Sequence, residues 1–545
     1  MAIYNPSFAA GTSVREWMLA GTLGISILAV AGVLLLLTAQ GLTHFWPANI
    51  LAWEIQEGGS PRELFGQVIR VENLTQQQIT ESRPPQPGVA NLPFSSAETQ
   101  RQQFLVHTGN RLSDPPGLQW VLEDQVLSVT ARPDIMAVER LIGGDAFGLP
   151  QSLLIGVSNT LVTDRRLIVS RILVQVERAR GLRARIETLE RDAMRRLSNQ
   201  LADGSLALEQ RTTLEQEMLL LRRDRAALYD QIEQDVLTLE TANGGELKVP
   251  VGDIVKVWLP NRMNLLDKAL HALGEIISFL SEGPRDSSTQ GGIFPALFGT
   301  VLMVMLMSLL VTPFGVIAAV YLHEYAKQGP LVRLIRIAVN NLAGVPSIVF
   351  GVFGLGFFVY LVGGNIDRLF FSDTLPSPTF GTPGLLWASL TLALLTVPVV
   401  IVSTEEGLAR IPQGLRDASL ALGATKAETL FNIVLPMASP AVLTGVILAL
   451  ARAAGEVAPL MLVGVVKLAP ELPIDSKFPF IHLEQKFMHL GFHIYDVGFQ
   501  APNSELARPL VFATALLLVA IVVLLNMTAI LLRRRLEQQY SGIGD

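Results

Sequence analysis

The chain contains six apolar stretches that are each long enough to cross a lipid bilayer. A spanning helix needs about 20 mainly apolar residues, and its backbone polar groups must be hydrogen-bonded within the protein. The sequence therefore predicts an α-helical polytopic membrane protein with six transmembrane helices. The predicted spans cover approximately residues 17–39, 293–321, 335–362, 385–402, 438–465 and 510–532.

The composition indicates that a large hydrophilic part accompanies these spans. Hydrophobic residues make up 50% of the chain and charged residues 17%, and the mean hydropathy is +0.41. These values are too apolar for an ordinary soluble protein and too polar for a bare helical bundle. The chain has no cysteine, which excludes disulfides and Cys-based metal sites, and its seven histidines have no metal-binding spacing.

Basic residues near the spans predict the orientation of the chain in the membrane. Lys and Arg concentrate in short cytoplasmic loops, and here they follow the second span at 327–336 and the last span at 533–535. The segments 1–16 and 536–545 are then cytoplasmic, and residues 40–292 form an external, periplasmic insert. The first span is taken as a retained helix, because its apolar run exceeds the ~7–15 residues of a signal-peptide core.

The external insert is predicted to contain a helical hairpin and some β structure. Between about 164 and 240, apolar residues recur every three or four positions in a charged background, which favours two antiparallel helices packed as a coiled coil. Residues 202–205 (Ala-Asp-Gly-Ser) are typical of the turn between them. Runs at 247–251 and 254–258 predict strands. The hairpin is interpreted either as a rigid spacer or as a docking arm for a solute-binding protein or envelope partner.

The loop between the fourth and fifth spans, residues 403–437, has a pattern that crossing a bilayer does not require. Pro412 suits a first helical position, and Gly423 suits the left-handed residue that ends a helix. Thr425 and Glu428 have the spacing of a capping box for a second helix. Pro436 is predicted to end that helix before the fifth span. One face of the first helix is small and smooth, which suits a groove in a soluble partner. Its residues are Leu415, Ala418, Ser419 and Leu422.

The spacing within this loop resembles the EAA loop of ABC importer permeases. The matching residues are Asp417, Ala418 and Ser419, then Gly423 after three residues, and then Ile433, Leu435 and Pro436. Asp replaces the usual Glu and Ser replaces the second Ala, so charge and small size persist. In that family the loop couples the permease to an ATPase subunit. The resemblance implies six transmembrane helices of the importer-permease type, with ATP and Mg bound by the partner ATPase.

Three further segments narrow the resemblance to phosphate-specific permeases of the PstA type. They are residues 321–326, 341–351 and 451–460. The resemblance covers about residues 293–535 and the first span, but not the insert. It implies ATP-driven import of inorganic phosphate across a bacterial inner membrane. It also implies a second permease subunit of the PstC type, two ATPase subunits of the PstB type and an external phosphate-binding protein of the PstS type.

Arg452 and Glu456 are the candidate residues of the substrate pathway. They lie four positions apart, on one face of the predicted fifth helix. Arg452 is expected about 14 residues into the span, near mid-depth, where a charge costs on the order of 2.5–3.5 kcal/mol. Arg matches phosphate by planar bidentate donation, and Glu456 would neutralise it in an empty pathway. The alternative is a structural ion pair. Gly344, Pro346 and Gly351 are interpreted as kink and close-packing positions.

Other functions stay open from the sequence. The carried oxyanion could be molybdate or sulfate, because one arginine does not set specificity. The chain could instead be a membrane sensor or scaffold that uses the external hairpin. No Gly-x-x-x-x-Gly-Lys-Ser/Thr phosphate loop occurs, and no catalytic constellation supports a membrane enzyme. The chain is therefore expected to be neither an ATPase nor another enzyme, to hold no cofactor or metal, and to bind lipid but no nucleic acid.

Overall fold

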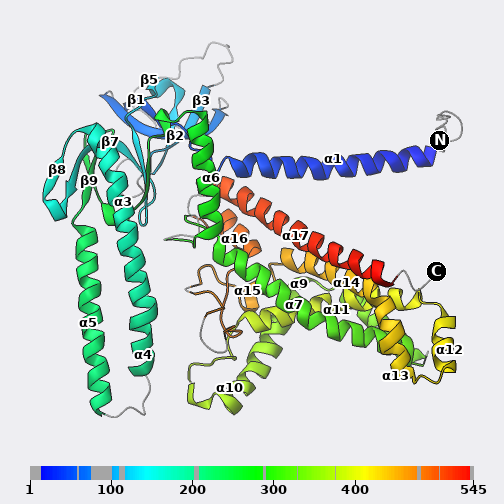
Figure 1. The fold of residues 1–545 in the computed structure, drawn as a ribbon. Helices are drawn as coiled ribbons and strands as arrows, with labels where there is room; N and C mark the ends of the chain where they lie inside the picture. The colour runs from blue at the N-terminus through cyan, green and yellow to red at the C-terminus, as the bar shows by residue number, and fades with distance from the viewer. Residues whose placement is uncertain are drawn as a thin grey trace, which may run out of the picture. The chain divides into compact units, whose positions relative to one another are not determined.

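The computed structural model describes residues 14–57, 60–74, 101–109, 117–201, 208–285, 290–327, 329–374, 376–469, 471–475, 480–501 and 504–540. The chain divides into two compact units, one made of Met1–Phe45 with Glu275–Asp545 and the other of Trp46–Gly274. In Figure 1 the elements are coloured from blue at the N-terminus to red at the C-terminus. The predicted turn at 202–205, most of the segment 1–16 and the last five residues of the tail lie outside the described residues.

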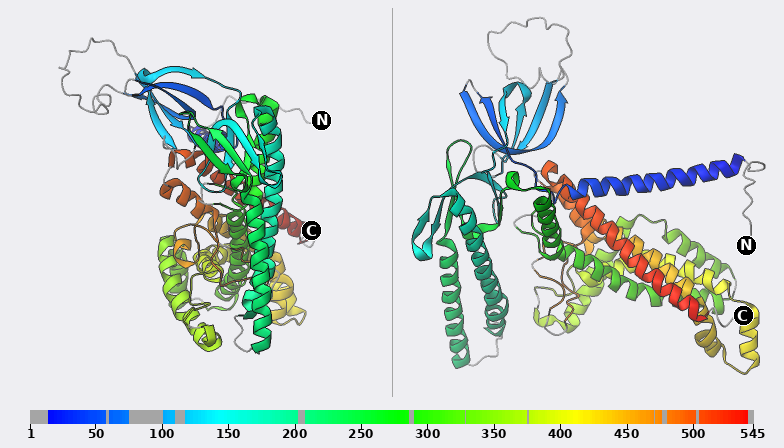
Figure 2. Two further views of the ribbon diagram at one scale, coloured as in Figure 1. Left: turned by 90° about the vertical axis from the view of Figure 1, so that its left-hand side faces the viewer. Right: turned by 45° about the horizontal axis from the view of Figure 1, so that its top comes forward.

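The unit Trp46–Gly274 is built on two antiparallel sheets. The strand order is β4-β3-β2-β1-β5 in the first sheet and β10-β9-β7-β6-β11 in the second, where β8 also pairs with β7. The right-hand view in Figure 2 shows strands of the first sheet side by side. The strands predicted at 247–251 and 254–258 are confirmed as β10 and β11. The strands are β1 (Leu51–Glu57), β2 (Ser60–Leu74), β3 (Arg101–His107), β4 (Leu118–Leu122), β5 (Val126–Thr130), β6 (Met136–Arg140), β7 (Ala146–Ile155), β8 (Thr160–Val162), β9 (Val236–Glu240), β10 (Glu246–Pro250) and β11 (Ile254–Trp258). The short turns η1 (Glu123–Gln125), η2 (Gly156–Ser158), η4 (Val251–Asp253) and η5 (Pro260–Arg262) lie between or after them.

Helix α3 (Arg165–Thr188) covers the second sheet with its apolar face. Ile168 and Ile172 are fully buried and share one core with Leu153 of β7 and Leu237 of β9. Their spacing of four residues places them on one side of the helix, as an amphipathic helix requires. Asp164 starts the helix as N-cap, because its carboxylate accepts a hydrogen bond from the Arg166 N–H at 2.9 Å.

The predicted hairpin is formed by α3 and the helices that follow it. The π-helical turn η3 (Leu189–Met194) leads into α4 (Arg195–Leu201), and α5 (Leu208–Glu233) returns beside them. The predicted end of the hairpin at residue 240 is wrong, since α5 ends at Glu233 and the next residues form β9. β9 pairs with β7 on one side and β10 on the other. Residues 236–240 therefore form a strand, because backbone hydrogen bonds to two neighbouring strands outweigh the weak helical periodicity of this segment.

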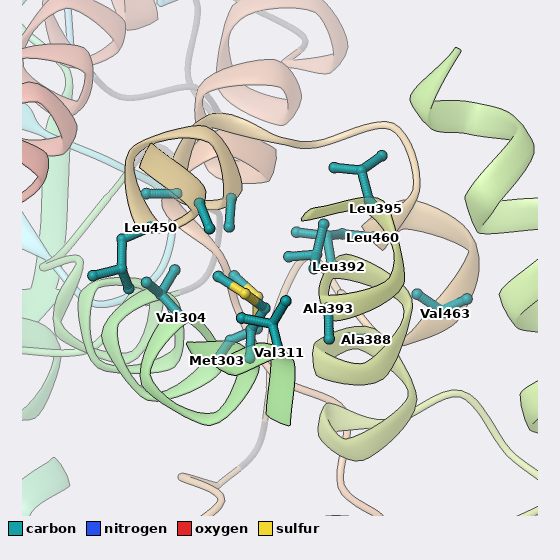
Figure 3. Close-up of a cluster of buried hydrophobic side chains, with 14 of the residues drawn as sticks. Met303, Val304, Val311, Ala388, Leu392, Ala393, Leu395, Leu450, Leu460 and Val463 are labelled. Carbon is teal, nitrogen blue, oxygen red and sulfur yellow. The ribbon is translucent and has the colours of Figure 1, made fainter. Parts of the chain in front are cut away.

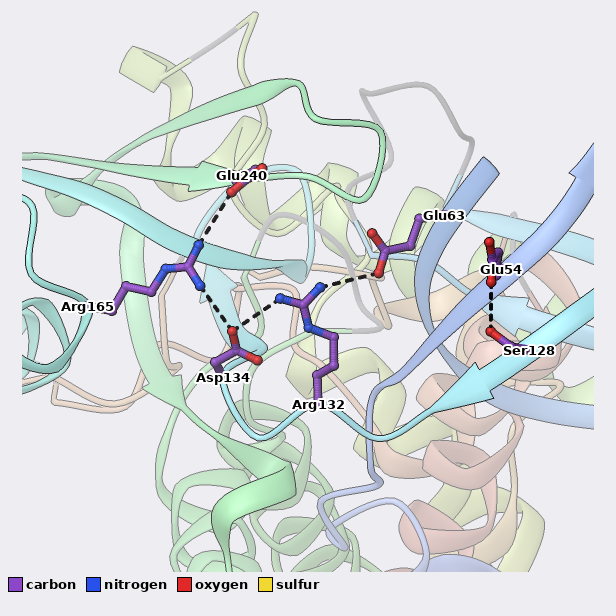
Figure 4. Close-up of polar contacts among 7 residues, drawn as sticks. All are labelled: Glu54, Glu63, Ser128, Arg132, Asp134, Arg165 and Glu240. Atoms are coloured by element: carbon purple, nitrogen blue, oxygen red, sulfur yellow. Dashed lines mark hydrogen bonds and ion pairs between the residues drawn. The ribbon is translucent and has the colours of Figure 1, made fainter. Parts of the chain in front are cut away.

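Ion pairs connect the first sheet, the second sheet and the start of α3 (Figure 4). Arg132 lies 3.4 Å from Glu63 of β2 and 3.3 Å from Asp134. Arg165 of α3 reaches Asp134 at 3.2 Å and Glu240 of β9 at 3.6 Å. Each pair is partly exposed and contributes little alone. Because Asp134 is shared by two arginines, the set positions the three elements relative to one another.

The other unit contains, among the described residues, six helices that are long and apolar enough to cross a membrane. The predicted helical polytopic fold is therefore confirmed. The spanning segments are α1 (Val14–Leu42), α7 (Phe294–Val320) with η6 (Tyr321–Tyr325), α9 (Ser347–Phe353) with η7 (Gly354–Gly363) and α10 (Gly364–Phe370), α11 (Leu385–Ala409), α13 (Lys426–Thr429) with η9 (Leu430–Val434) and α14 (Leu435–Gly455), and α17 (Ser504–Tyr540). The other helical segments are α6 (Leu265–Ser281), α8 (Pro330–Leu342), η8 (Ser372–Thr374), α12 (Gln413–Ala421), α15 (Leu460–Val463) and α16 (Leu490–Tyr495) with η10 (Asp496–Gln500).

The third span begins later than the predicted position 335. Helix α8 ends at Leu342, and the spanning helix starts only at Ser347. Pro346 explains the break, because proline has no N–H to donate and disfavours a helical conformation in the residue before it. Its backbone is extended, with φ −56° and ψ 133°. Residues 335–342 therefore belong to a separate short helix and not to the span.

The fifth span also has different limits from the predicted 438–465. Its helix runs from Lys426 to Gly455. Pro436 does not end a helix here, because it follows the π-helical turn η9 and sits at the start of α14. A π turn inserts a residue and removes the regular backbone bond that proline cannot make. The helix ends instead at Gly455, and Glu456 is extended with φ −77° and ψ 133°.

Helices α7, α11 and α14 surround one apolar core (Figure 3). Met303 of α7, Leu392 of α11 and Ala449 of α14 have no exposed surface. Leu460 and Val463 of the short helix α15 complete this core. The three spanning helices thus form the centre of the membrane unit.

Small residues allow these helices to approach closely. A Cβ atom added to Gly315 of α7 would lie 2.6 Å from the Val400 side chain of α11. A Cβ atom at Gly445 of α14 would lie 2.9 Å from the Cβ of Ser403, also on α11. Such distances leave no room for a larger residue. Close approach of this kind replaces the hydrophobic driving force that helices lack within lipid.

The chain leaves and re-enters the membrane unit at one aromatic cluster. The ring of Phe45, just after α1, lies 5.3 Å from the ring of Phe279 near the end of α6, measured between centroids. His44 lies 5.0 Å from Phe45 and 6.1 Å from Phe279. Edge-to-face contacts of this kind are favourable. The two ends of the inserted segment are therefore held next to each other.

A histidine between two carboxylates fixes the loop that joins the fifth and sixth spans. His482 Nε2 lies 3.0 Å from Asp475, and its Nδ1 lies 3.2 Å from Glu484. Both nitrogens can donate only when the ring is protonated. The hydrogen bond to Asp475, together with the charges of both carboxylates, raises the pKa of His482 above its ordinary value of 6.5.

We expect this loop to loosen as the pH rises. The pKa of His482 is raised in the folded protein. The protonated ring therefore stabilises the folded loop fully below about pH 6.5, and this stabilisation is lost as the pH rises through the raised pKa. Limited proteolysis between Phe480 and Glu484 should therefore be faster at alkaline than at mildly acidic pH. The His482→Gln variant should be cleaved at the alkaline rate at both pH values. A wild-type rate that did not change with pH would contradict the assignment.

Candidate functional site

The predicted loop 403–437 is mostly helical and shorter than expected. Helix α11 continues to Ala409, and the fifth spanning helix already begins at Lys426. The remaining part contains α12, and we call residues 410–429 the α12–α13 region. Pro412 is the N-cap of α12 rather than its first helical residue.

Local chemistry ends α12 and starts α13 as the sequence predicts. Gly423 has φ +91°, in the left-handed region that favours glycine. Thr425 caps α13, because its hydroxyl accepts a hydrogen bond from the Glu428 N–H at 3.3 Å. The Glu428 carboxylate accepts one from the Thr425 N–H at 2.7 Å. This reciprocal capping box fixes the turn between the two helices.

The α12–α13 region presents apolar side chains at its surface. Leu422, Leu420 and Leu415 are 89%, 46% and 39% exposed. Asp417 and Ala418 are exposed beside them. The three leucines give this short region an exposed apolar surface.

Ser419 was expected on the same smooth face, and this expectation is wrong. Its side chain is buried, and its hydroxyl oxygen lies 2.8 Å from that of Thr429 in α13. The small polar side chain lets α12 pack closely on α13. Of the later motif residues, Ile433 lies in the π turn η9, and Leu435 and Pro436 begin α14. They extend the spanning helix and do not form a loop.

An ion pair that the sequence interpretation did not assign holds α12 to the end of the second span. Arg416 lies 3.0 Å from Glu324 of η6, and the two side chains are only 11% and 14% exposed. Arg416 also donates hydrogen bonds to the carbonyl oxygens of Ile411 and Leu408, at 2.9 and 2.8 Å. Arg416 directly precedes Asp417, and Glu324 is the acidic residue of the segment 321–326. The two residues lie far apart in the chain, so no local sequence pattern indicates that they form a pair.

Arg452 and Glu456 are brought together, but not in the expected way. Arg452 Nε lies 3.4 Å from a Glu456 carboxylate oxygen. Arg452 sits in the last turn of α14, and Glu456 is the C-cap residue beyond the helix. Arg452 therefore lies at the end of the fifth helix and not in its middle, and Glu456 lies beyond the helix and does not share a helix face with it. Arg452 lies in this position because the fifth helix begins and ends at lower residue numbers than predicted: it ends at Gly455 and not near residue 465.

The three predicted kink and packing positions differ from one another in the structure. Gly344 and Pro346 lie in the break between α8 and α9. Among the residues that the structure describes, a Cβ atom at Gly344 would have one neighbour within 4 Å, the Asn341 carbonyl oxygen at 3.4 Å. At Gly351 it would lie 2.7 Å from the Pro459 Cα. Close packing is thus a property of Gly351, whereas the other two mark the break.

Comparison with known proteins identifies the family. Residues 311–541 match the family described as binding-protein-dependent transport system inner membrane component. Over 253 residues the chain is 32% identical to the phosphate transport system permease protein PstA of Yersinia pestis, covering 46% of this chain and 75% of that protein. The chain belongs to the PstA-type permeases. As a permease subunit, a PstA-type permease is not itself an enzyme.

A second PstA protein is matched over a smaller share of its length. The PstA protein of Mycobacterium leprae is 39% identical over 175 residues, which cover 32% of this chain and 52% of that protein. The chain thus spans about half the length of this curated relative. A solved inward-facing MetNI methionine ABC transporter is 20% identical and covers 44% of this chain and 94% of that chain, with a TM-score of 0.33.

We expect Gly423→Ala to loosen the α12–α13 region of this PstA-type permease. No described residue lies within 4 Å of a Cβ at this position, so the effect comes from the left-handed backbone and amounts to about 1–2 kcal/mol. Hydrogen–deuterium exchange of residues 413–429 should become faster. Gly414→Ala is the matched control, since that glycine also has space around it but no positive φ. Equal exchange in the two variants would refute the role of the Gly423 conformation.

Proposed function

We propose that this chain is the permease subunit of an ATP-driven importer that moves inorganic phosphate across the inner membrane. The observation that carries the proposal is the similarity to PstA proteins, which extends over three quarters of the Yersinia pestis protein. The partners would be a second permease of the PstC type, two ATPase subunits of the PstB type and an external phosphate-binding protein of the PstS type. Both termini would be cytoplasmic and the insert 40–292 periplasmic.

The α12–α13 region is the proposed contact with the ATPase. Its support is the exposed apolar surface around Leu422, flanked by the acidic side chain of Asp417. A short helix with apolar anchors suits a groove on a partner. ATP and Mg would be bound by that partner. The permease would then contribute only the surface through which ATP-driven movement reaches the membrane.

Arg452 is the proposed anion-binding residue of the pathway, with Glu456 as its counter-ion. The Arg452 side chain is one third exposed, and its pairing distance of 3.4 Å is long for a charged hydrogen bond. A phosphate oxygen could therefore compete with Glu456 for the guanidinium group. The alternative is structural, since a cation in the last turn of a helix is also favoured by the helix dipole.

The proposed ATPase contact and the proposed anion site lie at the two ends of one helix. The helix from Lys426 to Gly455 has 30 residues and is therefore about 45 Å long. Thr425 caps its start, and Arg452 lies in its last turn. A rotation or tilt driven at the first end would move the second. This arrangement supports coupling between the two regions through one continuous helix.

The proposed cargo is tested by uptake in a strain that lacks its own phosphate importer. Cells carrying this chain with its partner subunits should accumulate labelled phosphate in an ATP-dependent manner, and should accumulate sulfate or molybdate poorly. Preference for sulfate or molybdate would assign the chain to another oxyanion. Absence of any uptake, with the subunits assembled, would favour a sensor or scaffold built on the external hairpin.

Arg452→Ala should lower phosphate uptake by about 30-fold or more while assembly is retained, because loss of the charged partner of a bound anion costs about 2–5 kcal/mol. Arg452→Lys keeps the positive charge but lacks the planar guanidinium group with its paired N–H donors, and should recover only part of the uptake. Arg508→Ala, which breaks an exposed ion pair with Glu505 in α17, is the control and should transport normally. Full uptake by Arg452→Ala would refute the pathway role.

A further inference from the structure

The five-residue π-helical turn η6 at the end of the second span gathers contacts from both helices of the α12–α13 region. We propose that the ion pair between Glu324 and Arg416 is a permanent tie that makes η6, α12 and the start of α13 move as one body. ATP-driven displacement of α12 would then be transmitted directly to α7. This inference rests on the proposed coupling to an ATPase and names the positioning residues of that coupling.

The geometry of Arg416 favours a fixed rather than a transient contact. Its guanidinium lies 3.0 Å from Glu324 and donates to the carbonyl oxygens of Leu408 and Ile411. Those two carbonyls belong to the last turn of α11 and to the residue just before Pro412. One side chain therefore joins the end of α11, the start of α12 and η6. A planar group with several donors is well suited to such a junction.

The acidic partner is equally constrained. Glu324 is 14% exposed, and its carboxylate also lies 3.1 Å from His323 Nδ1. An ion pair with little solvent exposure is weakly screened by salt, and breaking it leaves a charge without its partner. Opening this contact during each transport cycle would therefore be costly. The pair is better suited to remain closed while the surrounding helices move.

A second contact ties α13 to the same turn. The Lys426 ammonium group contacts the Glu324 carbonyl oxygen and lies 4.5 Å from the centroid of the Tyr325 ring. Ser419 and Thr429 join α12 to α13 through their hydroxyl groups. The three contacts form a closed triangle between η6, α12 and α13. No member of this triangle can move far without the other two.

The triangle connects to the centre of the membrane unit through α7. Helix α7 runs directly into η6 and packs against α11 and α14 in the main core. At Gly315 it meets α11 so closely that a single added carbon would clash. Movement passed to η6 would therefore shift the packed helices together. The tie supplies a route to α7 in addition to the direct continuation of α13 into α14.

The absence of cysteine from the chain allows a direct test. In the assembled transporter, Glu324→Cys with Arg416→Cys removes the tie, and a short reducible bis-thiosulfonate linker replaces it covalently. Without the linker, phosphate uptake per ATP hydrolysed should fall at least about fivefold, the lower range of typical coupling effects, with the ATPase still bound. With the linker, most of the wild-type uptake should return, and reduction should abolish it again.

Two results would overturn the proposal. One is normal uptake per ATP in the unlinked variant, which would show that the tie is not needed. The other is low uptake after complete linking with the ATPase bound, which would show that the contact has to open. Glu505→Cys with Arg508→Cys in α17 is the control for the reagent, because that pair lies within one helix.

A substrate-independent measurement separates this proposal from the proposed cargo. Cysteines for paired spin labels are placed at Lys327 and Gln413, both exposed and on the two sides of the tie. The distance between them should be the same with and without bound ATP. A change in that distance would refute the tie even if phosphate is transported. An unchanged distance with no phosphate uptake by the wild-type complex would instead reject the phosphate assignment alone.

Discussion

Close approach of α7, α11 and α14 is the constraint on which the rest of the membrane unit depends. Helices in lipid gain little from burying apolar surface, so they associate through dispersion contacts that act only at short range. Gly315 against Val400 and Gly445 against Ser403 provide that short range. Because α11 and α14 are fixed in this way, their ends are fixed too. The α12–α13 region lies between those ends, and Arg452 lies in the last turn of α14.

Features set by local chemistry could be predicted from the sequence. The apolar spans, the left-handed Gly423 and the capping box of Thr425 and Glu428 each depend on residues close in the chain. The ion pair between Arg416 and Glu324 could not be predicted, because its partners lie in different helices and only the packing brings them together. Ser419 was placed on the wrong side of α12 for the same reason, since its partner Thr429 belongs to α13.

The predicted helix limits are wrong where the apolar pattern of the sequence is interrupted although the helix continues. Hydropathy does not include the polar first turn from Lys426, and it does not reveal that the π turn η9 accommodates Pro436. At Pro346 the opposite holds: a mainly apolar stretch of the sequence runs through this residue, but the helix is broken between α8 and α9. The shift of the fifth helix moved Arg452 from the middle of a span to the end of a helix. The position of Arg452 therefore depends on where the fifth helix begins and ends.

The aromatic cluster of His44, Phe45 and Phe279 explains how the membrane unit accommodates the inserted segment. It closes the membrane unit across the point where the inserted segment leaves and returns. A domain whose two ends are adjacent can be gained or lost without repacking its host. The cluster therefore marks a position at which a large hydrophilic segment is accommodated without repacking of the membrane helices.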